Sequence, residues 1–285
     1  MPAKLIKGKE VGDKVCADIS AELKDLYPKT DKVPGLGIIV VGEDPASLSS
    51  VRHKEKQSKK LGFYSEVHRL PATASTEDVC AVIQQINENN QIHGLLCQLP
   101  LPENLHEKAI LKAIDPGKDV GGMHPINAGK LFSGKRGYLP CSAYGLMQVI
   151  DFTKQPIYGK TAVMISRSDI VSKSLALLLL RRDASITFCP TLSGDLPEIC
   201  RTADILVTDA GKPGLVRGDW IKPGAVVIDA SVTRSGEKLV GDVVLEEAVK
   251  VAGWISTLPA GGDDPLTITM LMKNTLEAFK KRVMM

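Results

Sequence analysis

The sequence predicts an α/β protein of two domains, each built on a parallel sheet, with a cleft between the domains. Short apolar runs rich in β-branched residues alternate with longer amphipathic runs, which is typical of strands joined by crossover helices. The alternation occurs in two series, one before residue 100 and one after residue 160. The 285 residues of the chain are enough for two domains of ordinary size.

The first series contains three predicted strands and two predicted helices. Gly35–Val41 is a continuous apolar run and predicts a buried strand. Segment 47–61 is rich in Lys, Ser and Glu and predicts a helix that Gly62 ends. A second helix is expected to begin at Ser75–Asp78, where acidic residues occupy the first turn and apolar residues then recur at helical spacing. The other two strands are expected at 64–70 and 93–99.

The second series begins with a predicted strand at 161–165, followed by a short loop and an apolar helix at 170–180. Three further strands are expected at 185–188, 203–207 and 224–229. A last helix, 265–281, carries apolar residues at intervals and is expected to pack back on the first domain. The expected domains are therefore 1–145, joined by the C-terminal segment 265–285, and 146–264.

Composition excludes several classes of function. The formal net charge is +3 and aromatic residues make up 4% of the chain, which argues against nucleic acid as a partner. The six cysteines form no CxxC pair and are expected to be reduced, buried thiols rather than disulfides or metal ligands. The N-terminus lacks an apolar signal region and no apolar stretch approaches the length of a membrane span, so we expect a cytoplasmic protein.

Ten separated blocks carry a resemblance to a known family. They are Val41–Ser47, Lys54–Lys56, Gly94–Pro102, Lys118–Asn127, Pro140–Ser142, Gly159–Val163, Arg167–Val171, Gly211–Pro213, Gly218–Gly224 and Val240–Val243. In this order they resemble the methylenetetrahydrofolate dehydrogenase/methenyltetrahydrofolate cyclohydrolase (FolD-like) family along nearly the whole chain. The resemblance implies that the second domain is Rossmann-like and binds a dinucleotide. It also implies that 5,10-methylenetetrahydrofolate binds in the cleft, is oxidised by NAD(P), and is then hydrolysed to 10-formyltetrahydrofolate.

Function resides in sites rather than folds, so the family's working positions are compared one by one. The family places a tyrosine and a lysine four residues apart on a helix of the first domain, and a glutamine in the GLLxQLPLP block. Here the lysine is Lys54 and the glutamine is Gln98, whereas Ser50 stands in the place of the tyrosine. Residues four apart share a helix face, so Ser50 and Lys54 are expected to point the same way. These three residues are predicted as catalytic, with Lys54 handling protons.

Gly121 replaces the aspartate with which the family grips the pterin. A buried ligand edge left without its polar partner costs about 1–3 kcal/mol, so folate binds weakly, another group replaces the carboxylate, or the ligand is different. Asp119 and the pair Asp263 and Asp264 are the candidate replacements. Asp119 also has a structural interpretation, and the pair could simply be favourable charge at a helix N-terminus. The predicted substrate-binding set is Gly121, Asp119, Pro100, Asp263, Asp264 and Thr267.

The family's dinucleotide loop follows the first strand of the second domain, and its glycines allow backbone N–H groups to approach the diphosphate. Here serine occupies both glycine positions, and a Cβ at each narrows that space. Asp209 also stands where small apolar residues are usual, and its carboxylate would repel a diphosphate. These substitutions favour loss of NAD(P) use. The degenerate cofactor site comprises Ser166, Arg167, Ser168, Ser172 and Val232.

Three functions are compatible with this pattern. The main hypothesis is an enzyme repurposed to transfer the methylene group of a one-carbon tetrahydrofolate to another nucleophile, without NAD(P)-dependent oxidation. The alternatives are an ordinary bifunctional dehydrogenase/cyclohydrolase and a non-catalytic pseudoenzyme. A small-molecule folate is the expected partner in the two catalytic readings, the first hypothesis adds a one-carbon acceptor, and the resemblance implies a homodimer.

Overall fold

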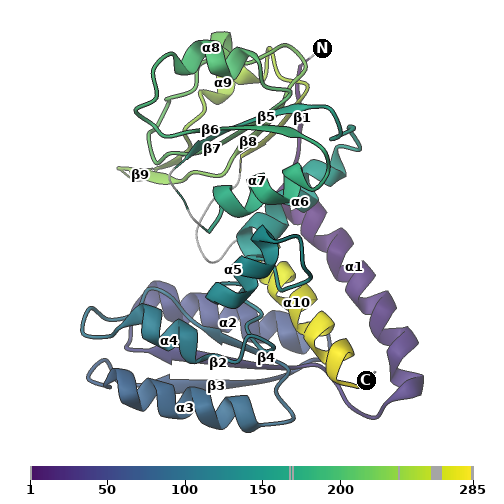
Figure 1. The fold of residues 1–285 in the computed structure, drawn as a ribbon, viewed down its shortest axis with the longest axis vertical. Coiled ribbons are helices and arrows are strands. Elements are labelled where there is room, and N and C mark those ends of the chain that lie inside the picture. The colour runs from purple at the N-terminus through teal and green to yellow at the C-terminus, as the bar shows by residue number, and fades with distance from the viewer. Residues whose placement is uncertain (1, 167, 169, 237, 258–264, 284–285) are drawn as a thin grey trace. The chain divides into compact units, whose positions relative to one another are not determined.

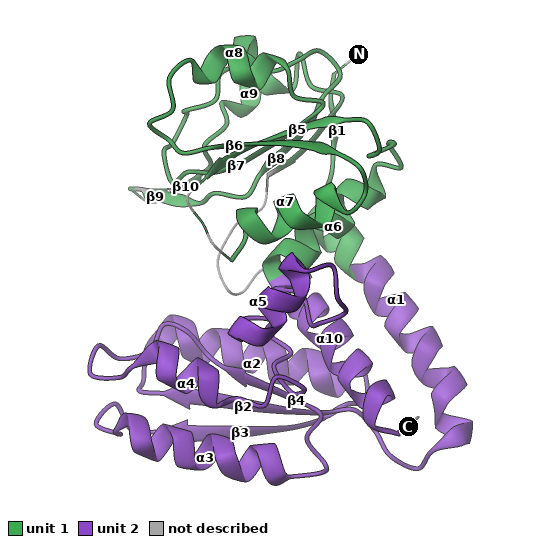
Figure 2. Cartoon of the chain, in the orientation of Figure 1, with its two compact units in different colours: residues 1–12, 142–266 green, residues 13–141, 267–285 purple. Residues whose placement is uncertain are grey.

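The computed structural model describes residues 2–283 except 167, 169, 237 and 258–264 (Figure 1). The chain divides into two compact units (Figure 2). Unit 1 comprises residues 1–12 and 142–266, and unit 2 comprises residues 13–141 and 267–285. Each unit contains a parallel sheet with helices, so the predicted class of two α/β domains with parallel sheets is confirmed.

Unit 2 contains a three-stranded parallel sheet in the order β3-β2-β4. The central strand β2 (Gly35–Val41) is buried along its whole length and pairs with β3 (Tyr64–Leu70) and β4 (Gly94–Cys97). A strand enclosed on both faces has no solvent side, which is why the sequence of β2 is a continuous apolar run without alternation.

The helices of unit 2 have sequence-encoded ends. Asp44 caps α2 (Pro45–Lys60) by accepting a hydrogen bond from the Ser47 N–H at 2.7 Å. Ser75 and Asp78 form a capping box at the start of α3 (Thr76–Glu88), where the helix was expected to begin. The other helices of this unit are α4 (Glu107–Ala113), α5 (Pro125–Phe132), the short 3₁₀ helix η1 (Tyr27–Lys29), and most of α1 (Gly8–Leu26) and α10 (Pro265–Val283).

Unit 1 contains a six-stranded parallel sheet in the order β1-β11-β8-β7-β5-β6. The strands are β1 (Lys4–Leu5), β5 (Thr161–Ser166), β6 (Ser185–Cys189), β7 (Ile205–Asp209), β8 (Val226–Asp229) and β11 (Trp254–Thr257). The antiparallel pair β9 (Thr233–Ser235) and β10 (Lys238–Val240) forms a separate two-stranded sheet. The helices are α6 (Cys141–Phe152), α7 (Ser172–Leu180), α8 (Leu196–Arg201), η2 (Gly218–Trp220) and α9 (Leu245–Ala248).

Each unit has its own buried apolar cluster. In unit 2 the cluster joins β2, β4 and α3 through residues that include Ile39, Leu95 and Ile83. In unit 1 neighbouring strands supply Val163, Leu206, Val227 and Ile255. Among the described residues, no helix is both long enough and apolar enough to cross a membrane.

Some boundaries differ from the sequence-based expectations. Strand β4 ends at Cys97 rather than at residue 99, because Pro100 has no N–H to continue a ladder. Strand β8 begins at Val226 rather than at residue 224, because Gly224 adopts a φ of +83°, outside the extended region. Strands β1 and β11 were not expected at all. Their pairing joins Lys4 to Trp254, at the opposite end of the sequence.

Candidate functional site

Two residues of α2 and one residue after β4 form a buried polar cluster in unit 2. Lys54 Nζ donates hydrogen bonds to Ser50 Oγ at 2.5 Å and to Gln98 Oε1 at 3.0 Å. Ser50 and Lys54 lie one turn apart, so the helix places both on the same face. Lys54 is 5% exposed and both of these oxygen partners are neutral. The three residues predicted as catalytic are therefore in direct contact.

Gln98 is oriented by its own backbone. Its Nε2 donates to the carbonyl oxygen of Leu99 at 2.6 Å, which leaves Oε1 as the side-chain atom directed to Lys54. The next residue, Pro100, follows a cis peptide bond and is exposed. The side chain on which Lys54 depends is thus fixed at the exit from β4.

Asp119 holds a loop of unit 2 through its side-chain hydrogen bonds. One carboxylate oxygen accepts from the Met123 N–H at 3.2 Å; the other accepts from the His124 N–H at 2.8 Å and from Asn127 Nδ2 at 2.9 Å. The residue is 3% exposed, and burial raises the pKa of its carboxyl. These contacts favour the structural interpretation of Asp119, and its role toward substrate stays a prediction.

Position 121 is able to hold an aspartate, although it holds glycine. A Cβ on Gly121 would have Leu96 Cδ1 as its nearest atom, at 3.2 Å, and that atom is the end of a flexible side chain. Gly122 is different. It has a φ of +72°, and a Cβ there would lie 2.3 Å from the carbonyl carbon of Leu139. The loop therefore requires glycine at 122 but tolerates a side chain at 121.

Asn274 on α10 supports the same loop and was not found from the sequence. Its Nδ2 donates to the carbonyl oxygens of Val120 at 2.8 Å and Leu139 at 2.9 Å, on either side of the two glycines. The only available signal was an amide within a helix of apolar spacing. Beside it, burial raises the pKa of the Cys141 thiol to about 12, so this cysteine is a neutral packing group rather than a nucleophile.

The remaining predicted residues of the substrate site and the cofactor site are placed as follows. Thr267 lies in the first turn of α10 and is half-buried. Val232 lies between β8 and β9 and is also half-buried. Arg167, Asp263 and Asp264 lie outside the described residues.

At the carboxyl ends of two neighbouring strands of unit 1, serine hydroxyls surround a carboxylate. Ser166 ends β5 and Asp209 ends β7, and the two residues are direct partners in the sheet. Burial and the charge of Asp242 raise the pKa of the Asp209 carboxyl, and the side chains of Ser168 and Ser166 act in the opposite direction. The same hydroxyl oxygens accept from the backbone: Ser166 Oγ from the Ser168 N–H at 2.8 Å, and Ser168 Oγ from the Val171 N–H at 3.1 Å. We refer to Ser166, Ser168 and Asp209 as the strand-end cluster.

Two further carboxylates lie near the strand-end cluster. Asp242 is fully buried and accepts from the backbone N–H groups of Ala210 at 2.6 Å and Lys212 at 2.7 Å. Burial, followed by the charge of Asp242, raises the pKa of Asp209 to about 6. Burial also raises the pKa of Asp229 to about 6. At neutral pH the Asp209 and Asp229 carboxyls are therefore mostly ionised.

These residues do not fit the diphosphate of a dinucleotide. The N–H groups of Ser168 and Val171, which a phosphate in this loop would need, are bound to serine oxygens. Asp209 adds a like charge. Ser172, at the start of α7, is fully buried, and its hydroxyl has no hydrogen-bond partner among the described residues.

Two family models match the chain in tandem. The catalytic domain of tetrahydrofolate dehydrogenase/cyclohydrolase matches residues 6–121, and the NAD(P)-binding domain of the same enzymes matches residues 140–283. The chain belongs to the tetrahydrofolate dehydrogenase/cyclohydrolase family. The resemblance stated from the sequence blocks is thereby confirmed.

Known relatives match the chain over its whole length. The bifunctional protein FolD of Moorella thermoacetica is 46% identical over 283 residues, covering 99% of this chain and 100% of the relative. The crystal structure of the bifunctional enzyme FolD from Campylobacter jejuni has a TM-score of 0.92 at 35% identity, covering 98% of this chain and 99% of that one. The FolD of Trypanosoma brucei, solved in complex with NADP and an inhibitor, has a TM-score of 0.90 at 34% identity, covering 99% and 98%.

The comparisons and the local geometry differ on the cofactor. Membership of the NAD(P)-binding domain family, and the NADP in the Trypanosoma brucei structure, count against the expected loss of NAD(P) use. The strand-end cluster of this chain counts in its favour. The family match applies to the domain as a whole. The strand-end cluster concerns only the residues at the place where the diphosphate would lie.

Proposed function

We propose that this chain acts on one-carbon derivatives of tetrahydrofolate, with hydrolysis of the methenyl form as its principal reaction and the complete dehydrogenase/cyclohydrolase sequence as the second candidate. The observation that carries the proposal is the buried Ser50–Lys54–Gln98 cluster. The names of the relatives, which are bifunctional FolD proteins, support the same chemistry. They give no support to methylene transfer to another nucleophile, so the ordinary family reactions replace that hypothesis.

The hydrolytic half-reaction needs only groups that unit 2 supplies. Water adds through its oxygen to the methenyl carbon, one carbon–nitrogen bond of the folate ring breaks, one proton goes to the released nitrogen and one is given up. Lys54 is the group that carries a proton at Nζ, and the oxygens of Ser50 and Gln98 hold that nitrogen in place. Because Lys54 is almost completely buried, its proton exchange is confined to the site.

The oxidative half-reaction needs NAD(P) as hydride acceptor. Ser166, Ser168, Ser172 and Val232 are the described residues that would line its site in unit 1, and the strand-end cluster does not fit the diphosphate. Hydrolysis of the methenyl form is therefore the principal activity that we propose. The complete bifunctional enzyme is the second candidate, and the match to the NAD(P)-binding domain favours it.

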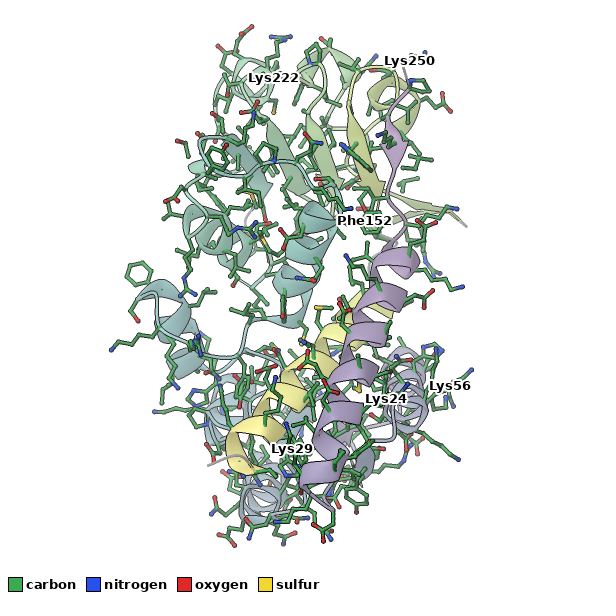
Figure 3. All side chains as sticks on the ribbon, turned by 90° about the vertical axis from the view of Figure 1, so that its right-hand side faces the viewer. Lys24, Lys29, Lys56, Phe152, Lys222 and Lys250 are labelled. Atoms are coloured by element: carbon green, nitrogen blue, oxygen red, sulfur yellow. The ribbon has the colours of Figure 1, made fainter. Side chains whose placement is uncertain are left out.

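The proposal is tested by following the absorbance of 5,10-methenyltetrahydrofolate as it is hydrolysed by the full-length protein. Replacing Lys54 with Met keeps the length of the side chain but removes the proton carrier, and we expect kcat to fall by about 10²- to 10⁴-fold. Lys56→Met on the same helix is the matched control. Lys56 is exposed (Figure 3), and its replacement is expected to leave kcat unchanged.

Three results would separate the candidates. Wild-type rates in Lys54→Met would remove Lys54 from the mechanism. Tetrahydrofolate binding without any turnover would favour the pseudoenzyme. Formation of NADPH from methylenetetrahydrofolate and NADP⁺ at rates similar to hydrolysis would establish the complete bifunctional enzyme.

We also propose a homodimer, on the basis of the family resemblance. Light scattering during size-exclusion chromatography is expected to give about 61 kDa, twice the 30.7 kDa of one chain. A mass close to that of one chain at micromolar concentration would contradict it.

A further inference from the structure

The sheet order of unit 1 identifies where a ligand of this fold would lie. The first strand of the 142–266 segment, β5, has β6 on one side and β7 on the other. In doubly wound parallel sheets, ligands bind outside the carboxyl ends of the strands, at the point where the strand order reverses. In this chain the two residues at that point are Ser166 and Asp209, which are paired in register.

The strand-end cluster occupies this point with polar side chains. Asp209, a half-buried carboxylate at the end of β7, lies beside Ser166 through the register of the two strands, and the hydroxyls of Ser168 and Ser166 lower its pKa against the larger effect of burial. Those hydroxyls then accept the backbone N–H groups of Ser168 and Val171. The two serine oxygens and the Asp209 carboxylate therefore lie together at the same strand ends.

This arrangement lacks the two features with which proteins bind an anion such as phosphate. A phosphate at a strand-to-helix loop is held by unpaired backbone N–H groups and by positive potential. Here two of those N–H groups are already bound, and Asp209 contributes a negative charge next to the buried carboxylate of Asp242.

We propose that Asp209, together with Ser166 and Ser168, is a specificity element that excludes the diphosphate of NAD(P) from the carboxyl end of β5. The inference rests on the proposed function. If both hold, the chain hydrolyses methenyltetrahydrofolate without oxidising the methylene form. Asp209 acts here as a determinant of cofactor binding and takes no part in the one-carbon chemistry.

The test measures binding of NADPH to the full-length protein by the fluorescence of its nicotinamide, without reference to turnover. Wild type is expected to show no saturation at micromolar NADPH. The double variant Ser166→Gly/Asp209→Ala is expected to bind at least about tenfold more tightly, because it removes the charge and releases the Ser168 N–H. Asp209→Asn removes the charge alone and keeps the side-chain shape, so it is expected to give part of the gain even if the double variant folds poorly.

The matched control is Asp219→Ala, which removes an exposed carboxylate from the same unit. It is expected to leave NADPH binding as in wild type. Saturation of wild type at micromolar NADPH overturns the inference, and so does a failure of Asp209→Asn, folded by circular dichroism, to bind more tightly than wild type. Methenyltetrahydrofolate hydrolysis measured on the same samples tests the proposed function separately. A protein that excludes NADPH but hydrolyses nothing contradicts only the proposed function.

Discussion

At the scale of single residues, the folate site departs from its family pattern most sharply at Gly121. The loop around it is well supported, since Asp119 accepts from three donors on one side and Asn274 binds two carbonyl oxygens on the other. The backbone of this loop is therefore held by contacts that do not involve a side chain at 121. We expect glycine at this position to affect binding of a pterin edge rather than the folding of the loop.

Gly121→Asp is expected to tighten tetrahydrofolate binding by about 1–3 kcal/mol, roughly 5- to 150-fold in the dissociation constant. The reason is that a polar ligand edge would regain its acceptor, at a position where the tightest contact of a Cβ is the tip of Leu96 at 3.2 Å, with Asp119 Oδ1 at 3.7 Å and Met123 Cγ at 3.8 Å. Isothermal titration with tetrahydrofolate measures the change. Gly129→Asp is the matched control, because it adds the same carboxylate to an exposed site with open space. Equal affinities for the two variants would show that position 121 does not face the ligand.

Asp209 gives a residue-scale prediction about pH. Its pKa is raised to about 6 from an ordinary value of 3.8, so the folded state holds the proton more tightly than the unfolded state. Between about pH 4 and pH 6 the folded state therefore binds more protons, and stability falls as pH rises. The penalty is absent below pH 4 and complete above pH 6.

Asp209→Asn removes this titration. Urea unfolding is expected to show the variant more stable than wild type by on the order of 1–3 kcal/mol at pH 7, with most of that difference gone at pH 4. Asp219→Asn, at an exposed position, serves as the control. A difference between Asp209→Asn and wild type that is the same at both pH values would mean that the charge of Asp209 costs the fold nothing.

At the scale of elements, the sequence predicts those helices and strands whose position is determined by neighbouring residues. The apolar run of β2 and the capping box of α3 could be located because burial and capping leave compositional marks. The pairing of β1 with β11 could not be, since a two-residue strand has no period and its partner lies at the other end of the chain.

The same division applies to the candidate site. The contact between Lys54 and Ser50 follows from helical spacing, and Gln98 was found through the family block. The closed environment of Asp119 depends on the folded path of residues 123–127, so the sequence left its structural and functional interpretations open. The adjacency of Ser166 and Asp209 depends on strand register, which no local pattern encodes.

The N-terminal cap of α3 is expected to contribute to the stability of the protein. Ser75 Oγ accepts the Asp78 N–H at 3.1 Å, and the Asp78 carboxylate accepts the Ser75 N–H at 2.9 Å. Ser75→Ala is expected to cost about 1 kcal/mol of unfolding free energy, within the range of 0.5–2 that N-caps show. Chemical denaturation measures it. Thr73→Ala removes an exposed hydroxyl two residues earlier and is expected to change stability by less than about 0.5 kcal/mol. Equal losses in both variants would contradict a capping role.

At the scale of the whole molecule, the chain contains two compact units with separate sheets and separate apolar clusters. A chain of this kind need not unfold in one step, so a ligand can stabilise one unit more than the other. The three residues of the proposed catalytic cluster, Ser50, Lys54 and Gln98, belong to unit 2. The free energy of folate binding is therefore expected to appear as resistance of unit 2 to opening.

Hydrogen exchange with and without tetrahydrofolate tests this distribution. At a free ligand concentration of 100 times its dissociation constant, the bound state gains about 2.7 kcal/mol over the open state, which slows the slowest-exchanging amides of unit 2 roughly 100-fold. The effect is expected in α2 and β4, and in the central strands of unit 1 it is expected to be much smaller. NADPH at the same concentration is expected to protect neither β5 nor β7, because the strand-end cluster excludes its diphosphate. Protection by NADPH confined to β5 and β7 would place a dinucleotide at the strand ends after all. Protection by tetrahydrofolate that was equal in both units would show that they open together.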